Sequence, residues 1–183
     1  MLEPRIQQHF YDSADLQYQN AETLVRPIAD AAQALVGAFT AGGKLMICGS
    51  GGGAALAVYA AAMLAGRFER ERPALAALAL AAEPSYALQL QALGQPGDVL
   101  LLIHAGGDAA ALGAALDAAH EADMTVVALT AAGSALAERL GEIDVTLAVP
   151  HERAARVLET QLLALHALAD AVDLQLMGEQ DPA

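Results

Sequence analysis

Two glycine-containing loops carry the residues of this sequence whose types and spacing could do chemistry. The first, Gly49-Ser-Gly-Gly-Gly53, follows the short apolar run Lys44–Cys48 and precedes an alanine-rich helical stretch. The second, Ile103–Asp108, also lies between an apolar run and a helical stretch. Such a loop binds anions, because backbone N–H groups and the positive end of the helix dipole face the ligand. The two loops are therefore predicted to bracket a phosphorylated small molecule.

The first loop also leaves a second interpretation open. Gly49-x-Gly51-x-x-Ala54 satisfies the loose fingerprint of a dinucleotide-binding loop, with Glu83 as a candidate ribose acceptor. Glu83 follows the loop by about thirty residues rather than the usual twenty or so. Helical segments also precede the first strand, which is unusual for that fold. A nucleotide-binding oxidoreductase is therefore the weaker alternative, and a Walker A loop is excluded because no Gly-Lys-Ser/Thr follows.

Alternating strands and helices are expected to position these loops. Beyond residues 44–48, apolar runs occur at residues 75–80, 99–103, 125–129 and 145–149, and helical stretches such as Ala109–Glu121 lie between them. Strands that are apolar on both faces and alternate with helices are typical of a parallel sheet covered on both sides. The sequence therefore predicts an α/β fold.

Helices are predicted at both ends of the chain. Two segments open it, the first marked by Ile6, Phe10 and Leu16 and the second running to about Phe39. The last helix, about 152–177, carries a heptad-like apolar seam of Leu158, Leu162, Leu165, Ala169, Val172 and Leu176. We expect this helix to be shared between the core and a partner subunit, and a core helix alone is the alternative.

The length of 183 residues favours a single domain. Its expected parts are N-terminal helices (1–43), an α/β core (44–150), a C-terminal helix (151–177) and a polar tail (178–183). The excess of alanine and leucine, with 56% hydrophobic residues and 4% aromatic ones, suggests more apolar surface than one small core can hide. We therefore expect an oligomer.

Charge and composition exclude several classes of function. The net charge of −13, with one lysine, argues against direct nucleic-acid binding, which needs clustered basic residues. The one basic group, at 67–72, interleaves three arginines with glutamates and predicts an ion-pair cluster, with an anion site as the alternative. No apolar run is long enough for a membrane span, and Glu3-Pro4 does not fit a signal peptide. The single Cys48 fits a reducing compartment, so a cytoplasmic protein is expected.

Four stretches carry a resemblance to a known family. They are Lys44–Ala55, Gly66–Pro73, Ala92–Leu100 and Met124–Thr130. Over nearly its whole length the sequence resembles the phosphoheptose isomerase branch of the sugar isomerase (SIS) family. This resemblance implies a three-layer αβα sandwich of flavodoxin-like type with a five-stranded parallel sheet. It also implies a homotetramer with pockets at the subunit interfaces.

The family's functional residues are mostly replaced. Where the resemblance implies a metal-binding histidine and a carboxylate four residues later, this sequence has Tyr59 and Met63, and Leu158 replaces a glutamine. His166 matches a family histidine. The first loop ends in Gly53 instead of serine, and the second has lost its hydroxyl-bearing side chains. The segment after the second strand, 81–90, is about a dozen residues shorter than in the isomerases. The sequence therefore predicts no cofactor and no metal.

Three further stretches, Arg5–Phe10, Arg67–Pro73 and His151–Arg156, are similar to the DnaA initiator-associating proteins (DiaA) within this family. That likeness implies a contact with the initiator through Leu176 and Met177. The expected function is thus a non-catalytic homotetramer that regulates bacterial DNA replication by binding DnaA. The alternative is a sugar-phosphate isomerase, or a sugar-phosphate-binding protein, with an altered pocket. The pocket residues would then be Ser50, Gly51, Gly52, Gly53, His104, Gly106 and Asp108.

Overall fold

A five-stranded, all-parallel sheet forms the centre of the molecule. The computed structural model describes residues 1–82 and 85–179. The strands are β1 (Leu45–Gly49), β2 (Ala77–Ala79), β3 (Val99–His104), β4 (Thr125–Ala131) and β5 (Val145–Val149), in the order β2-β1-β3-β4-β5. The helices are α1 (Leu2–Thr40), α2 (Gly52–Ala65), α3 (Tyr86–Leu93), α4 (Ala110–Glu121) and α5 (Ala154–Met177), with a short 3-10 helix, η1 (Ala137–Arg139). The predicted five-stranded parallel sheet is confirmed.

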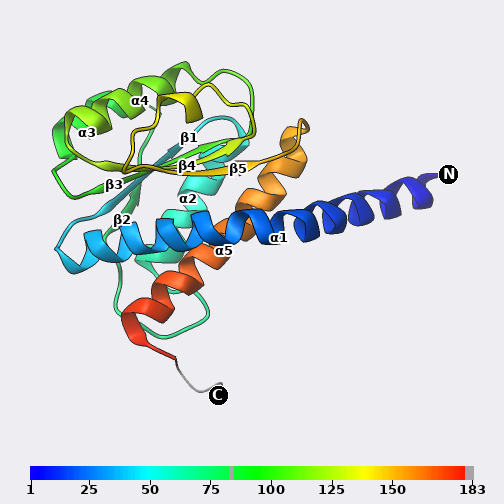
Figure 1. Ribbon diagram of the computed structural model, residues 1–183, viewed down its shortest axis with the longest axis horizontal. Helices are drawn as coiled ribbons and strands as arrows, with labels where there is room; N and C mark the ends of the chain where they lie inside the picture. The colour runs from blue at the N-terminus through cyan, green and yellow to red at the C-terminus, as the bar shows by residue number, and fades with distance from the viewer. Residues whose placement is uncertain (83–84, 180–183) are drawn as a thin grey trace.

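Helices cover both faces of the sheet, which gives the three layers that were predicted (Figure 1). Helices α3 and α4 lie on one face, and α1, α2 and α5 lie on the other. Along β1, Leu45 and Ile47 point into the cluster shared with α1, α2 and α5, whereas Met46 and Cys48 point to α3 and α4. All four side chains are fully buried. Burial on both faces explains why the strands appear in the sequence as continuous apolar runs.

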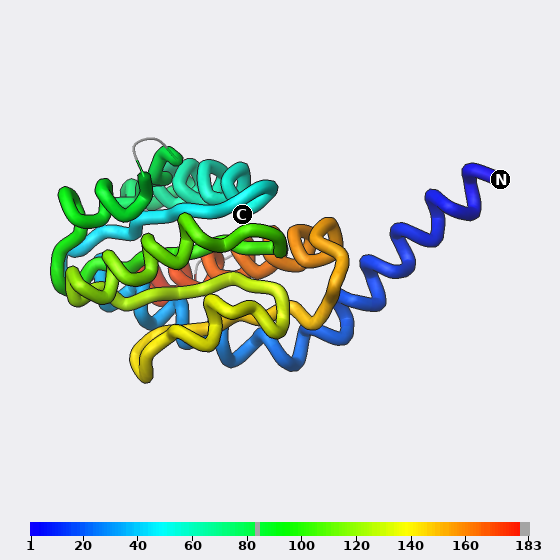
Figure 2. Tube along the Cα trace, turned by 90° about the horizontal axis from the view of Figure 1, so that it is seen from above, coloured from blue at the N-terminus to red at the C-terminus, as the bar shows by residue number. Residues whose placement is uncertain are grey.

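The two helical segments predicted at the N-terminus form one helix, α1, of 39 residues. The stripe that faces the core runs through Leu16, Asn20 and Leu24, so a buried polar residue interrupts the apolar pattern without interrupting the helix. Asn20 Nδ2 donates to the carbonyl of Leu16 at 2.8 Å. Pro27 lies inside the helix and costs it one backbone hydrogen bond. Packing of α1 across α5 outweighs this loss, while the first turns of α1 project beyond the domain (Figure 2).

The seam of α5 turns mainly toward its own domain. Leu165, Ala169 and Val172 are buried in the core, while Leu158, Leu162 and Leu176 are half-buried. Sharing of this helix with a partner subunit therefore remains a prediction. No helix within residues 1–82 and 85–179 has both the length and the apolar character needed to cross a membrane.

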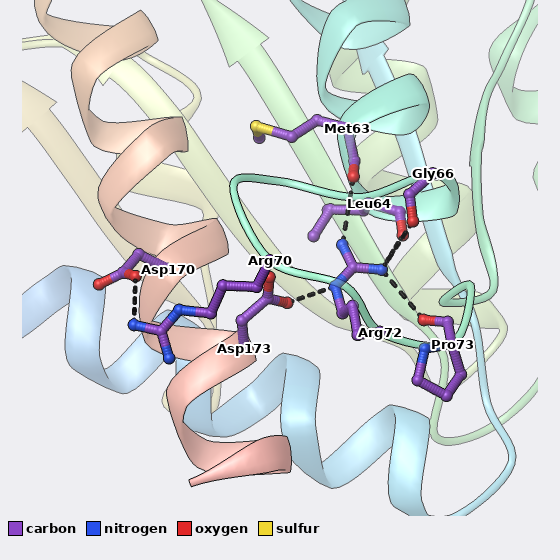
Figure 3. A network of polar contacts seen from close by, with 8 residues as sticks. All are labelled: Met63, Leu64, Gly66, Arg70, Arg72, Pro73, Asp170 and Asp173. Carbon is purple, nitrogen blue, oxygen red and sulfur yellow. Dashed lines mark hydrogen bonds and ion pairs between the residues drawn. The ribbon is translucent and has the colours of Figure 1, made fainter. Parts of the chain in front are cut away.

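A buried arginine fixes the end of α2 to α5 (Figure 3). Arg72 Nε donates to Asp173 Oδ1 at 2.5 Å, and both side chains are 1% exposed. The remaining guanidinium nitrogens donate to the carbonyls of Met63, Leu64, Gly66 and Pro73. Carbonyls in the last turn of a helix lack partners within the helix, and Arg72 supplies them.

The ion-pair cluster predicted at residues 67–72 is thus confirmed, but its members differ in burial. Arg67 pairs with Glu71 at the surface, and Arg70 pairs with Asp170 at 3.2 Å. Arg72, in contrast, lies in the interior of the subunit. All three cations are engaged by carboxylates, which weakens the alternative of an anion site there.

Candidate functional site

The strand order places both glycine-containing loops at one edge of the sheet. In the order β2-β1-β3-β4-β5 the chain reverses direction across the sheet between β1 and β3, and ligands of such sheets bind beyond the carboxyl ends of these two strands. The first loop follows β1 and the second follows β3. The backbone N–H of Ser50 donates to the carbonyl of Ile103 at 3.2 Å, which joins the two loops. We call the region where these two loops meet, at the carboxyl ends of β1 and β3, the loop crevice.

The N-terminus of α2 lies at the loop crevice, and no side chain neutralises the positive end of its helix dipole. Its N-cap is Gly51, with φ of 54°, no side chain caps it, and its first turn holds no acidic residue. Gly51 and Gly52 are exposed. The N–H groups of Gly53 and Ala54 donate to the carbonyls of Ser50 and Gly51 at 2.9 and 3.2 Å, and the helix dipole at such an end favours an anion. Anion binding at the first loop therefore stays a prediction.

Gly53 has a structural reason to lack a side chain. A Cβ at this position would collide with the backbone carbonyl of Ile103. The serine that the family resemblance implies here does not fit unless the loop moves away from β3. Gly53 therefore lacks the serine hydroxyl because the first loop lies too close to Ile103 of β3 for any side chain.

Ser50 and His104 meet across the crevice. Ser50 Oγ and His104 Nδ1 are 2.9 Å apart, and His104 is 5% exposed. The carbonyl of His104 accepts a hydrogen bond from Gln161 of α5 at 3.1 Å, which fixes the end of β3. Desolvation by burial lowers the pKa of His104, while the negative charge of Asp108 acts in the opposite direction. The ring is therefore held mainly in its neutral form at neutral pH.

The second loop differs from the first in its helix N-terminus. Asp108 Oδ1 accepts a hydrogen bond from the backbone N–H of Ala110 at 2.9 Å, so a carboxylate already lies at the start of α4. Gly106 and Gly107 have φ of 131° and 91°, which shapes the turn before it. A second anion at this helix would be repelled by Asp108. The structure therefore favours α2 over α4 as the anion-binding helix.

The four positions where family function was expected lie along the contact between α2 and α5. Tyr59 and His166 form a hydrogen bond of 2.8 Å between the phenol oxygen and Nε2. Met63 is 7% exposed and belongs to the core, and Leu158 lies against Gly52. The structure thus brings Tyr59 and His166 together, while His104 lies at the end of β3 and bonds to Ser50 of the first loop instead.

Sequence reasoning missed three parts of this region. The hydrogen bond from Tyr59, which is 42% exposed, to His166 was not predicted. Phe68 stacks on His166, with ring centroids 5.3 Å apart and an interplanar angle of 22°. Gln161, fully buried, also donates to the carbonyl of Leu129 at 3.1 Å. The sequence held one signal for the Tyr59–His166 contact. Gly52 and Tyr59 are seven residues apart, so Tyr59 lies on the helix face that begins at the first loop.

The side chains present do not fit the metal site that the family implies. Zinc in proteins is bound by Cys, His, Asp and Glu. At the three implied positions stand a phenol, a thioether and an aliphatic side chain, from Tyr59, Met63 and Leu158. Within residues 1–82 and 85–179, no group of three or more His, Cys, Asp or Glu side chains is arranged to hold a metal ion.

The remaining predicted residues lie away from the loop crevice. Leu176 is half-buried and packs against the core, and Met177, the last residue of α5, is 42% exposed. Glu83, the candidate ribose acceptor, lies outside the described residues, as does the end of the polar tail, 180–183.

Comparisons with known proteins agree on one family. Residues 8–131 match the SIS domain. The chain is 56% identical over 99% of its length to a phosphoheptose isomerase from Methylibium petroleiphilum, of which it covers 98%, and 43% identical over 98% to one from Thiobacillus denitrificans, covering 99%. The structure of phosphoheptose isomerase GmhA from Neisseria gonorrhoeae superposes with a TM-score of 0.87 at 36% identity, covering 94% of this chain and 99% of that chain.

These relatives correct the function that the sequence favoured. The expectation of a non-catalytic regulator that binds DnaA is wrong, because relatives of 56%, 43% and 42% identity over nearly the whole chain are phosphoheptose isomerases. A HobA–DnaA complex from Helicobacter pylori superposes with a TM-score of 0.64 but at 14% identity, which shows the fold alone. The alternative of a sugar-phosphate protein with an altered pocket fits the relatives better.

Proposed function

The chain belongs to the SIS domain family, in its phosphoheptose isomerase branch, and from this premise we propose that it binds a sugar phosphate in the loop crevice and isomerises it. The observation that carries the proposal is the open N-terminus of α2, which lies between the Ser50–His104 contact at one end and the Tyr59–His166 contact further along the same helix. Such a reaction needs two parts: an anion site, here at the start of α2, and a proton-transfer pair, here Tyr59 of α2 with His166 of α5.

The phosphate is placed at the first loop. Gly51 and Gly52 expose the start of α2, and Ser50 adds a hydroxyl beside it. Backbone N–H groups at a helix N-terminus bind phosphate without basic side chains, which suits a chain of net charge −13.

The reacting carbons are placed near His166. Tyr59 follows Gly51 by eight residues, which corresponds to about 12 Å along the helix axis. A phosphorylated seven-carbon chain can span this distance from the anion site. His166, hydrogen-bonded to Tyr59 at 2.8 Å, is then the group that takes and returns a proton.

Isomerisation by this pair balances without an oxidant or a reductant. The imidazole of His166 removes the proton from the carbon next to the carbonyl, and the C–H electron pair becomes the double bond of an enediol. The phenol of Tyr59 protonates the former carbonyl oxygen and becomes a phenolate. Return of the proton from His166 to the neighbouring carbon, with transfer of the other hydroxyl proton to the Tyr59 phenolate, completes the exchange of carbonyl and alcohol and restores both residues.

We expect the purified protein to convert sedoheptulose 7-phosphate to its aldose isomer. In D₂O, deuterium from the solvent should enter the substrate at the carbon that loses its proton, and NMR would record both the exchange and the product. Binding without exchange, seen as saturable calorimetric heats, would leave a sugar-phosphate-binding protein. The absence of both binding and exchange would contradict the proposed function.

We also propose the homotetramer that the family resemblance implies. Large apolar side chains are exposed along α1 and the adjoining face of α5: Ile6, Phe10, Tyr18, Val25 and Leu163. The first turns of α1 extend beyond the domain, where a second subunit could cover them (Figure 2). Light scattering at micromolar concentration should give the mass of four chains, and the mass of one chain would contradict the assembly.

A further inference from the structure

We propose that Ser50 and His104 form a proton-dependent phosphate clamp, in which His104 Nε2 donates a hydrogen bond to a phosphate oxygen of the ligand. This inference rests on the proposed function, because it assigns the residue that holds the phosphate of the same substrate. It also explains how the second loop can bind a phosphate after losing its hydroxyl side chains.

One ring nitrogen of His104 is fixed and the other is open. Nδ1 lies 2.9 Å from Ser50 Oγ. Nε2 forms no hydrogen bond within the described part of the chain. Unlike the fully buried polar atoms without a partner, it is accessible to solvent. When the Ser50 hydroxyl donates to Nδ1, the neutral ring carries its proton on Nε2. The contact therefore sets Nε2 as a donor toward the crevice.

The position of His104 suits a phosphate bound at α2. His104 ends β3, and the adjacent Ile103 accepts the N–H of Ser50, one residue before the N-cap Gly51. An anion at the N-terminus of α2 would thus lie next to the imidazole. The helix that follows His104 cannot serve in its place, because Asp108 already occupies the N-terminus of α4.

Protonation of His104 should strengthen the clamp. Burial favours the neutral ring in the free protein, whereas a phosphate dianion next to Nε2 would favour the imidazolium. Among the groups around the ring, Asp108 contributes a negative charge from the second loop. Ser50 of the first loop, Thr130 of β4 and Gln161 of α5 are uncharged, and the phenol of Tyr86 in α3 donates to the carbonyl of Gly49 at 2.8 Å. Binding therefore takes up a proton, and affinity falls as the pH rises.

Sulfate is the probe that isolates this effect, since it keeps its double charge where a sugar phosphate itself titrates near pH 6. Calorimetry with sulfate from about pH 5 to pH 8 should show the affinity of the wild type falling as the pH rises. His104→Gln keeps an amide donor but cannot titrate. Its affinity should not change with pH, and at the acidic end it should be about 10- to 100-fold weaker, as expected when a hydrogen bond between charged partners is lost.

Two further variants keep the test decisive. His151→Gln changes a histidine near the start of α5 whose Nδ1 accepts the N–H of Arg153, and it should retain the wild-type pH profile. If His104→Gln does not fold by its melting curve, Ser50→Ala provides the second measurement, and we expect it to weaken sulfate binding about 10-fold.

The outcomes separate the clamp from the proposed function. Absence of sedoheptulose 7-phosphate binding by the wild type would contradict the proposed function itself. If the wild type binds the sugar phosphate but its sulfate affinity does not depend on pH, or if His104→Gln behaves as wild type, the clamp is wrong while the function stands. Sulfate binding that all variants share equally would be an adventitious ion only, and would likewise contradict the clamp.

Discussion

Replacing Asp173 by alanine is expected to lower the free energy of unfolding by about 3–5 kcal/mol, the usual cost of removing one partner of a buried ion pair. Asp173 and Arg72 are each 1% exposed, so the guanidinium would remain in the interior without its carboxylate. Arg72 would also be free to leave the carbonyls of Met63 and Leu64, which it joins to α5 (Figure 3). The effect should appear in urea unfolding as a lower midpoint.

Asp170→Ala is the matched control for this experiment. It lies three residues earlier on the same helix and pairs with Arg70, but its side chain is 52% exposed. An exposed pair contributes about 0–1 kcal/mol. Replacement of both members of the buried pair, as Arg72→Met with Asp173→Leu, should recover much of the lost stability, because no unpaired charge remains. Equal midpoints for Asp173→Ala and Asp170→Ala would contradict the role given to the buried pair.

The sheet could be predicted from the sequence because its strands are buried on both faces. Each strand from β1 to β5 is a short apolar run bounded by Gly, Pro or Asp, and helical stretches separate the runs. The weakest prediction was β2, expected over 75–80 and observed as Ala77–Ala79 at the edge of the sheet. An edge strand pairs on one side alone, so fewer of its residues are held in strand geometry.

The single helix α1 could not be predicted because burial there does not follow side-chain polarity. Asn20 is 2% exposed although it is polar, so the apolar pattern has a gap at a point where the helix continues. The carbonyl of Leu16 accepts its amide, which makes burial of the polar side chain less costly. Packing against α5 maintains the helix across this gap.

The wrong prediction of a DnaA-binding regulator relied in part on residues that pack within the subunit. The stretch Arg67–Pro73 contributed to the supposed likeness to DnaA-binding relatives, but Arg72 within it caps α2 and pairs with Asp173 in the same subunit. A resemblance that rests on packing residues does not identify a partner. The loops after β1 and β3 could be placed from the sequence, whereas the Tyr59–His166 contact joins residues 107 positions apart and needed the structure.

The largest effect on activity is expected for His166→Gln, which should lower kcat for sedoheptulose 7-phosphate by about 10²- to 10⁴-fold, the usual contribution of a general acid–base group. Glutamine keeps a hydrogen-bonding group near Tyr59 but cannot take a proton from carbon. Because the phosphate is placed about 12 Å away along α2, KM should change little. Solvent deuterium incorporation into the substrate should fall together with kcat.

His104→Gln is the contrasting variant, because it changes the opposite end of the same ligand. The phosphate clamp predicts a higher KM with kcat largely retained, since binding would be lost equally from the ground state and the transition state. Tyr59→Phe should fall between the two, because it removes the hydroxyl that lies 2.8 Å from His166 Nε2 while leaving the imidazole in place. Wild-type kcat in His166→Gln, with melting curves unchanged, would mean that the proton is moved by another group and would overturn the placement of the reacting carbons beside α5.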